Sequence, residues 1–244
     1  MQGYSRIFSL SLILIVSVSG LHAQTLDSYE YQSEFTWGIN KNTFGGLIGG
    51  FFFKKARKLN DKTLETYGLE IVNVKHPQEI RKTSGTGNFF INGKSNYLYA
   101  FRFQYGRDLI LFKKAPQQGV EIKGVFALGA SLGIQAPYYV EYSPRSGSGP
   151  DSRTYFAQFD PNNPDDILGT GRLFQGLGES KIKLGGNLKV AMNFELGTTK
   201  SSVTGFEAGF LLDAYTSEVI LIPTAYNYSV FPTLFIAIFY GSRK

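Results

Sequence analysis

His76 is the only histidine after the first 23 residues, and it is the side chain best suited to proton transfer. Histidine titrates near neutral pH and is the most common general base, and Ser84 lies eight residues further on as a nucleophile for it to activate. No recognisable serine motif surrounds this pair, however, and His76 adjoins Pro77 at the start of a loop-like segment. A lone histidine in that position is usually a polar loop residue, so no catalytic residue is assigned.

Residues 160–166 (DPNNPDD) carry carboxylates and amides at a spacing like that of a calcium-binding loop. Pro164 stands at a ligand position, Asp165 stands where the loop needs glycine, and Gly171 replaces the bidentate glutamate. The chain has no cysteine, which excludes a thiolate metal site. We therefore predict a turn-rich loop, with no metal site and no cofactor.

Charged residues recur at every second position of several apolar segments. Residues 181–196 (KIKLGGNLKVAMNFEL) alternate polar or small side chains with apolar ones, and the same period appears in residues 31–40, 97–111, 120–138 and 204–214. A period of two belongs to a β-strand whose two faces meet different surroundings. We predict that the polar faces meet in one network, formed by Glu34, Arg102, Asp108, Glu121, Lys123, Lys183, Lys189, Glu195, Glu207 and Asp213.

The strands that must position this network are long and rich in aromatic residues. The 244 residues include 28 glycines, 15 tyrosines and 21 phenylalanines, which favours strands and tight turns. The alternating segments run for about ten residues or more, as tilted membrane strands do, whereas soluble strands average about five or six. Tyr, Trp37 and Phe gather on the apolar faces. These features favour a membrane barrel over a soluble sandwich or barrel.

The segments number eight and predict an all-β fold, an eight-stranded antiparallel up-and-down transmembrane β-barrel with long extracellular loops. The connections at residues 59–61, 115–118 and 199–200 are short, whereas those at 77–94, 143–180 and 217–227 are long. This alternation is typical of bacterial outer-membrane barrels, which have short periplasmic turns. The expected strands are residues 31–40, 44–58, 62–76, 95–113, 119–142, 181–198, 201–216 and 228–240.

The N-terminus predicts export. Arg6 precedes an apolar run at residues 7–18, and Ala23 offers a small residue for cleavage before Gln24. We predict a signal peptide at residues 1–23, with an uncleaved anchor as the alternative, and a mature barrel at 24–244. The expected location after cleavage is the outer membrane of a Gram-negative bacterium.

With this plan, the Ala23–Gln24 junction and the absent lipobox cysteine, the chain resembles small outer-membrane β-barrels of the Bacteroidota type. The resemblance is strongest in residues 67–81 (YGLEIVNVKHPQEIR) and 96–142. These barrels form an uncharacterised group, and the resemblance implies an accessory subunit of a larger outer-membrane complex. One departure is that such chains commonly close on an aromatic residue, whereas Tyr240 is followed by four more residues.

The interior of an eight-stranded barrel is just wide enough to be filled by side chains, so we expect a polar plug and not a wide pore. Function then falls to the loops, above all to residues 143–180, whose apolar side chains must fold over the barrel mouth or bind a partner. The residues expected to bind a partner are Tyr155, Phe156, Phe159, Leu173 and Phe174.

The predicted function is that of a non-enzymatic structural or accessory subunit of an outer-membrane protein complex. The alternatives are a lipid-modifying enzyme that uses His76 and a narrow ion pathway. The expected partners are outer-membrane lipid and other outer-membrane or cell-surface proteins, and no nucleic acid. The net charge is +6, which favours contact with anionic surfaces. Several basic residues lie near the predicted periplasmic turns, among them Arg57, Lys58, Lys62, Arg243 and Lys244.

Overall fold

The computed structural model describes residues 31–45, 49–113, 119–143, 153–172, 175–196 and 201–244. The predicted signal peptide lies outside these residues. Among them, no helix has the length and apolar character needed to cross a membrane. The elements of the wall are β1 (Ser33–Asn42), β2 (Gly50–Asn60), β3 (Thr63–Val74), β6 (Asn96–Phe112), β7 (Glu121–Pro137), β11 (Lys181–Glu195), β12 (Ser202–Val219) and β13 (Tyr228–Arg243).

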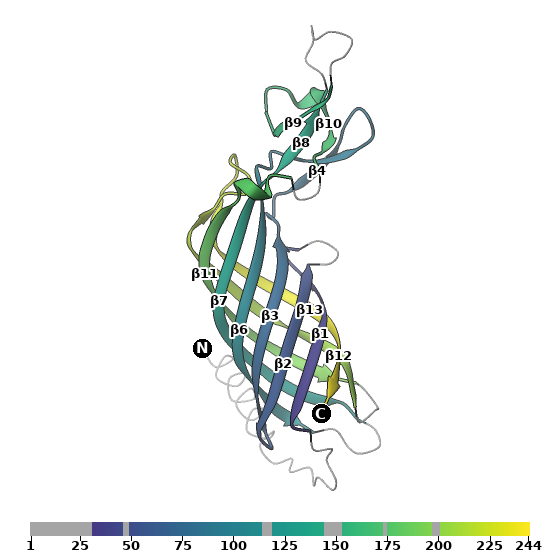
Figure 1. The fold of residues 1–244 in the computed structure, drawn as a ribbon, viewed down its shortest axis with the longest axis vertical. Coiled ribbons are helices and arrows are strands. Elements are labelled where there is room, and N and C mark those ends of the chain that lie inside the picture. The colour runs from purple at the N-terminus through teal and green to yellow at the C-terminus, as the bar shows by residue number, and fades with distance from the viewer. Residues whose placement is uncertain (1–30, 46–48, 114–118, 144–152, 173–174, 197–200) are drawn as a thin grey trace, which may run out of the picture.

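These eight strands form one closed barrel in which every strand pairs antiparallel with its neighbours along the chain (Figure 1). The ring closes where β1 pairs with β13, over a register that runs from Glu34 opposite Arg243 to Asn42 opposite Phe235. Closure leaves the sheet with no free edge along this register. The predicted fold class, an all-β eight-stranded up-and-down barrel, is confirmed.

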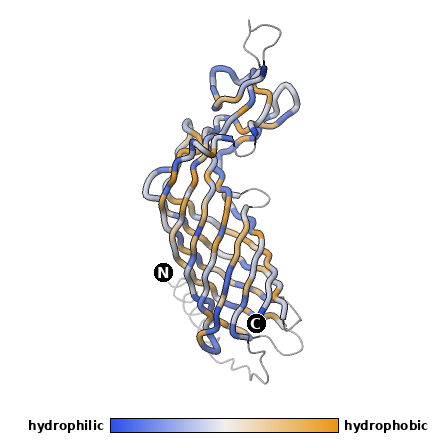
Figure 2. The backbone as a smooth tube through the Cα atoms, viewed as in Figure 1, coloured by the Kyte–Doolittle hydropathy of each residue, from blue (hydrophilic) through white to orange (hydrophobic). Residues whose placement is uncertain are grey.

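The two faces of each strand have opposite character, as the alternating colours in Figure 2 show. On β13, Leu234 is 62% exposed whereas its neighbour Phe235 is 6% exposed. The exposed outward faces of the other strands are likewise apolar, and many of their side chains are aromatic. This wide apolar exterior is what a bilayer would cover, since soluble proteins rarely expose contiguous apolar areas of that size.

The observed strand bounds differ from the prediction at two places that matter below. β2 begins at Gly50 and not at residue 44, because the chain turns after β1, where the Asn42 side chain accepts a hydrogen bond from the Phe44 N–H at 3.1 Å. β13 continues through Gly241 to Arg243, three residues beyond the predicted end.

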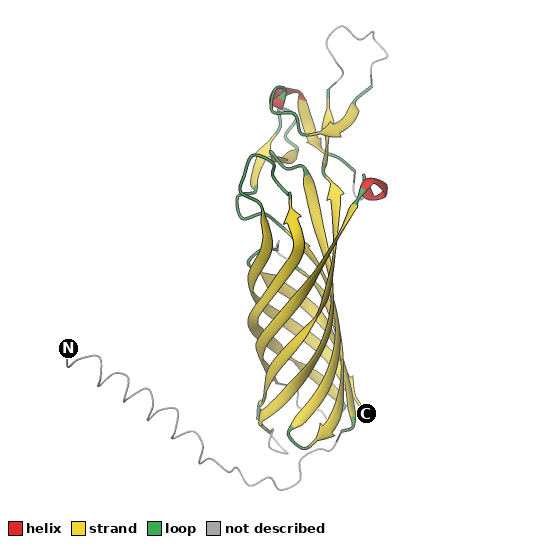
Figure 3. Cartoon of the chain, turned by 90° about the vertical axis from the view of Figure 1, so that its left-hand side faces the viewer, coloured by secondary structure: helices red, strands yellow, loops and turns green. Residues whose placement is uncertain are grey.

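Two of the long connections contain strands of their own. Residues 77–94 hold the hairpin of β4 (Ile80–Thr83) and β5 (Phe89–Asn92), with Gly87 at a φ of 85° in its turn. β8 (Tyr139–Tyr142) follows β7 after a single residue and lies between β9 (Tyr155–Gln158) and β10 (Ile167–Thr170) in a three-stranded sheet. We call the hairpin and this sheet together the cap; it stands beyond the end of the barrel opposite the C-terminus (Figures 1 and 3).

Leu188→Arg should impair insertion, because an arginine on the lipid face near the midplane of a barrel costs about 2 to 4 kcal/mol. Ile80→Arg is the matched control, since Ile80 is also exposed, at 60% against 47% for Leu188, but lies in the cap. Folding yield into lipid vesicles, read from heat-modifiable mobility, should fall for Leu188→Arg only. Equal yields would mean that the exterior of β11 does not face lipid.

Candidate functional site

The barrel interior holds two groups of ion pairs. The group nearer the C-terminus surrounds Lys123 and Arg243 with the carboxylates of Glu34, Glu121 and Glu195. Lys123 Nζ lies 3.2 Å from both Glu34 and Glu121 and 3.7 Å from Glu195. Arg243 donates to Glu34 at 3.0 and 3.1 Å, to Glu121 at 3.3 Å and to Glu195 at 2.8 Å. The group thus joins four strands, β1, β7, β11 and β13, and includes both sides of the β1–β13 closure.

The second group is a continuous chain of alternating charges. Its contacts are 2.5 to 3.1 Å long, except for one of 3.5 Å between Lys54 and Glu207. Asn193 donates to Glu207 at 3.0 Å and Ser131 to Asp213 at 2.8 Å, which supplies further hydrogen bonds to the carboxylates. The chain runs in the order Asp108, Lys54, Glu207, Lys189, Glu70, Arg102, Asp213.

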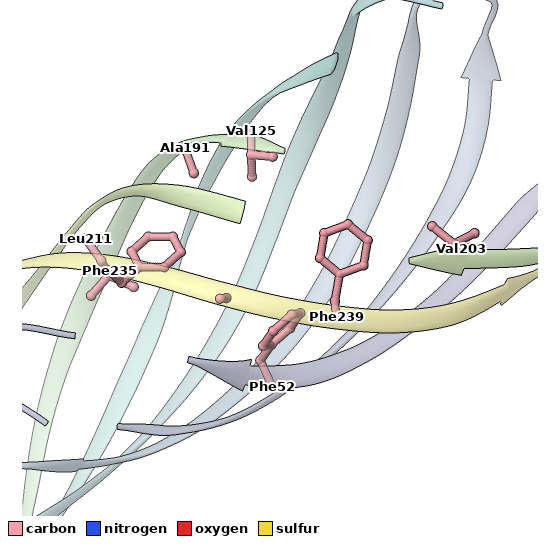
Figure 4. Close-up of a cluster of buried hydrophobic side chains, with 8 residues drawn as sticks. Phe52, Val125, Ala191, Val203, Leu211, Phe235 and Phe239 are labelled. Carbon is pink, nitrogen blue, oxygen red and sulfur yellow. The ribbon is translucent and has the colours of Figure 1, made fainter. Parts of the chain in front are cut away.

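Apolar side chains fill the space beside these charges. Figure 4 shows one buried cluster, to which Phe52 and Phe235 belong, and the Lys189 ammonium lies 5.7 and 4.7 Å from their ring centroids. A second cluster, with Leu98 and Phe231, lies inside the end of the barrel that carries the cap. Buried charge costs several kcal/mol per ion unless it is paired, and here it is paired and enclosed. The described interior is therefore packed with side chains.

The structure places the predicted interior residues as follows. Nine of the ten are buried and take part in the two groups. Lys183 is the correction: it lies near the outer end of β11, partly exposed, and donates to Ser217 Oγ and to the Glu218 carbonyl, both at 2.9 Å. Its strand face is inward, but at its height the partners are loop atoms.

Two cations of the interior were not in the predicted network. Arg243 was expected at the periplasmic rim, because β13 was expected to end at Tyr240. The alternation of Phe235, Ala237, Phe239 and Gly241, continued by two residues, places Arg243 on the inward face. Lys54 could have been found in the same way, since it follows Phe52 at the period of two within β2.

Lys189 shows what pairing changes. The inward position of Lys189 alone would predict that Lys189→Ala impairs the barrel much less than an arginine on the lipid face does. In the structure the Lys189 ammonium lies 2.7 Å from both Glu70 and Glu207. Removal of one partner of a buried pair costs about 3 to 5 kcal/mol, so we now expect Lys189→Ala to be about as destabilising as an arginine on the lipid face.

The cap has a hydrophobic core of its own, formed by Phe90, Tyr138, Val140, Tyr142 and Ile167. The Tyr138 hydroxyl accepts a hydrogen bond from the Ile91 N–H at 3.0 Å and lies 2.8 Å from Thr170 Oγ1, so that one side chain joins β5 to β10.

The predicted partner-binding residues are spread over this cap. Phe159 stacks on Phe90 and packs against the core. Tyr155 is exposed and stacks on Tyr142, and Phe156 is half-buried under the Arg172 guanidinium. Leu173 and Phe174 lie outside the described residues. The described apolar side chains of residues 153–172 thus pack mainly against Tyr138 and β8 and against the β4–β5 hairpin.

His76 has a structural position that the sequence did not indicate. β1 ends opposite Phe235 and β2 begins opposite Val72, so β13 and β3 continue past them toward the cap. There His76, just after β3, reaches the segment before β13. His76 Nε2 lies 2.9 Å from the Tyr226 carbonyl oxygen, and the ring stacks on Tyr228. Nδ1 accepts a hydrogen bond from the Gln78 N–H at 3.1 Å. Both ring nitrogens are engaged with backbone groups, which leaves neither to take a proton from a nucleophile.

The calcium-like segment uses its carboxylate locally. Asp160 accepts hydrogen bonds from the Asn162 N–H at 2.9 Å and from the side chains of Asn162 and Asn163, both at 3.0 Å. These contacts stabilise a turn. In the part of the chain that the structure describes, no three histidine or acidic side chains are grouped so as to hold a metal ion.

Comparison with known proteins finds similar folds only. No protein-family model matches the chain, and no curated protein does. Ail, the attachment invasion locus protein of Yersinia pestis, is 12% identical over 88% of this chain and 99% of its own, with a TM-score of 0.42. Ail in complex with the heparin analogue sucrose octasulfate is 9% identical over 88% and 99%, at 0.40. Neisserial surface protein A is 12% identical over 87% and 95%, at 0.33. At these values the likeness carries no argument about function.

Arg243→Met should lower the free energy of unfolding by about 3 to 5 kcal/mol, because three buried carboxylates would be left to share Lys123. Lys244→Met is the control, since that neighbouring side chain is exposed. The midpoint of urea unfolding in lipid vesicles measures the difference. Adding Glu195→Gln to Arg243→Met should recover part of the loss. If Arg243→Met unfolds at the same midpoint as Lys244→Met and the wild type, the pairing does not stabilise the barrel.

His76→Ala should loosen the wall between β3 and β13, because it removes the hydrogen bond to Tyr226 and the contact with Tyr228. Amide hydrogen exchange at residues 220–228 should become faster, by the equivalent of about 1 kcal/mol. His76→Gln keeps an N–H donor at the Nε2 position and should stay close to the wild type. Unchanged exchange in His76→Ala would show that the contact does not hold the wall together.

Proposed function

We propose that this protein is a non-enzymatic outer-membrane β-barrel that anchors its cap at the cell surface and serves there as a structural or accessory subunit of an outer-membrane complex. The barrel contacts outer-membrane lipid, and the cap contacts another outer-membrane or cell-surface protein. The observation that carries the proposal is the combination of a filled interior with a cored cap.

The joint between cap and barrel supports this role. β8 follows β7 after Tyr138 alone, and the Tyr138 N–H donates to the Ser95 carbonyl at 2.7 Å. The two parts of the cap are also tied together: the Ser84 and Thr86 hydroxyls donate to the Leu168 carbonyl at 2.8 and 2.7 Å. A surface held on a rigid base loses little conformational entropy when it binds, which favours recognition.

The exposed side chains of the cap suit a protein partner. Tyr155, Phe89 and Ile80 remain exposed although the cap has a core into which apolar side chains could pack. Aromatic residues are enriched at protein interfaces, where they bury large areas at a low entropic cost. We therefore propose Tyr155 and Phe156 of β9 as the centre of the contact, with Phe159 positioning the strand from behind.

The alternatives have less support. An enzyme that uses His76 would need a free ring nitrogen, and both nitrogens are engaged with backbone groups. An ion pathway would need room beside the charged groups, and these are interlocked in pairs with packed apolar side chains around them.

The apolar exterior and the predicted signal peptide support an outer-membrane location. The resemblance to barrels of the Bacteroidota type supports a complex of that membrane as the setting. Both parts of the proposal are tested together by purification from the native membrane.

Tyr155→Glu/Phe156→Glu should abolish recovery of the partner that co-purifies with the wild type in mild detergent, because it would place a charge on each face of β9, the edge strand where the contact is proposed. Tyr226→Glu is the control, since Tyr226 is 76% exposed but lies outside the cap. Heat-modifiable mobility should show that all three barrels are folded. Full recovery of the same partner with the double variant would place the contact on the lipid face or the periplasmic rim.

A further inference from the structure

A cavity of about 520 Å³ lies between the barrel wall and the β4–β5 hairpin. Its walls come from the turn after β1 at residues 43–45, the end of β3 and the residues that follow it, the hairpin itself and the start of β6. Asn73 and Lys75 lie there on the outward face of the wall, since they alternate with the buried Val72 and Val74. The cavity therefore opens at the cap end of the apolar exterior.

The charges around this cavity are unbalanced. Lys75, Arg81 and Lys94 contribute three cations, and Glu79 is the single carboxylate of the lining. The Glu79 Oε1 atom accepts from the Lys94 ammonium at 2.5 Å and from the His76 N–H at 3.1 Å. Within the described ranges, Lys75 and Arg81 have no carboxylate within ion-pair distance. Two positive charges thus remain without a counter-charge.

Lys94 is enclosed to an unusual degree for a lysine. Its side chain is 0% exposed, and its ammonium lies 4.5 Å from the centroid of the Tyr97 ring. Burial lowers the pKa of Lys94 despite the opposing effect of Glu79, and the charge of Lys75 lowers this pKa further. An anion in the cavity would favour the charged form of Lys94, because it would add negative charge to that of Glu79 and offset the charge of Lys75.

The rest of the lining includes polar and aromatic side chains. Asn73 lines the cavity, and its buried Oδ1 atom has no hydrogen-bond partner among the described residues, which is costly. Phe44, Phe89 and Phe90 provide flat apolar faces, and the Arg81 guanidinium lies 4.2 Å from the centroid of the Phe89 ring. A ring that bears hydroxyl groups and an anionic group would match the cations, the Asn73 amide and the aromatic side chains of the lining.

We propose that this cavity binds a phosphorylated sugar, with the phosphate held by Lys75 and Arg81 beside the positive charge of the buried Lys94, a sugar hydroxyl bonded to the Asn73 side chain, and the ring packed against the phenylalanines. The same chemistry has two sources: the headgroup of a phosphorylated glycolipid in the surrounding outer leaflet, and a soluble sugar phosphate. The site is independent of the protein contact proposed for β9.

The test uses two probes on the full-length protein. Glucosamine 1-phosphate is titrated into detergent-solubilised protein by calorimetry. In the second arm, the protein is reconstituted in phosphatidylcholine nanodiscs with and without one tenth of diphosphorylated lipid A, and the glycolipid retained after re-extraction is measured by mass spectrometry. Retention of the glycolipid without binding of the soluble probe identifies the headgroup as the source, and the reverse identifies the soluble sugar phosphate.

Lys75→Gln/Arg81→Gln should weaken binding of the effective probe by tenfold or more. Lys82→Gln/Lys181→Gln is the matched control: it removes the same charge from the same end of the molecule, and neither residue lines the cavity. Its affinity should stay within threefold of that of the wild type. The proposal is overturned if the wild type binds neither probe, or if the two double variants lose affinity equally.

Discussion

The structure depends on the pairing of charges that the closed barrel encloses. A closed ring of eight strands has an interior that water cannot keep solvated, so each lysine, arginine or carboxylate on an inward face must find a partner there. Glu34 and Arg243 stand opposite each other in the register that joins the first strand to the last, and their side chains are also bonded. Ring closure and charge pairing therefore stabilise each other, because a shift of the register would separate Glu34 from Arg243 and leave the two charges without this partner.

Packing of the interior moves recognition to the outside of the barrel. The lipid-facing residues are selected for a uniform apolar surface, which offers little specificity, and the short connections leave little chain for a binding surface. The long connections supply it, and the Tyr138 side chain shows how: its hydroxyl joins β5 to β10 while its backbone is held by the barrel wall. Two loops far apart in the sequence become one surface because each covers the apolar side chains of the other.

The period of two was enough to predict the faces, because burial alternates over most of each wall strand, where one side meets lipid and the other meets packed side chains. It could not locate Arg243, since the end of β13 depends on pairing with β1 and not on local sequence. It could not predict the cap either. Phe159 packs against Phe90, which comes from another loop, and no local pattern in the sequence indicates that contact. Lys183 alternates in step with the inward residues of β11, but it lies too near the end of the strand to reach the ion pairs. The position of a residue along the barrel axis is set by the stagger of the strands.

The contacts of His76 connect the wall to the cavity beside it. Because β1 ends opposite Phe235 and β2 begins opposite Val72, β13 and β3 continue past them, and the His76 side chain connects the two there. The same histidine holds Glu79 through its backbone N–H, and Glu79 in turn holds the Lys94 ammonium. One residue thus fixes both the upper wall and the carboxylate that orients the buried lysine. A longer hairpin would complete the hydrogen-bond ladder, but it would also fill the space in which the three cations gather.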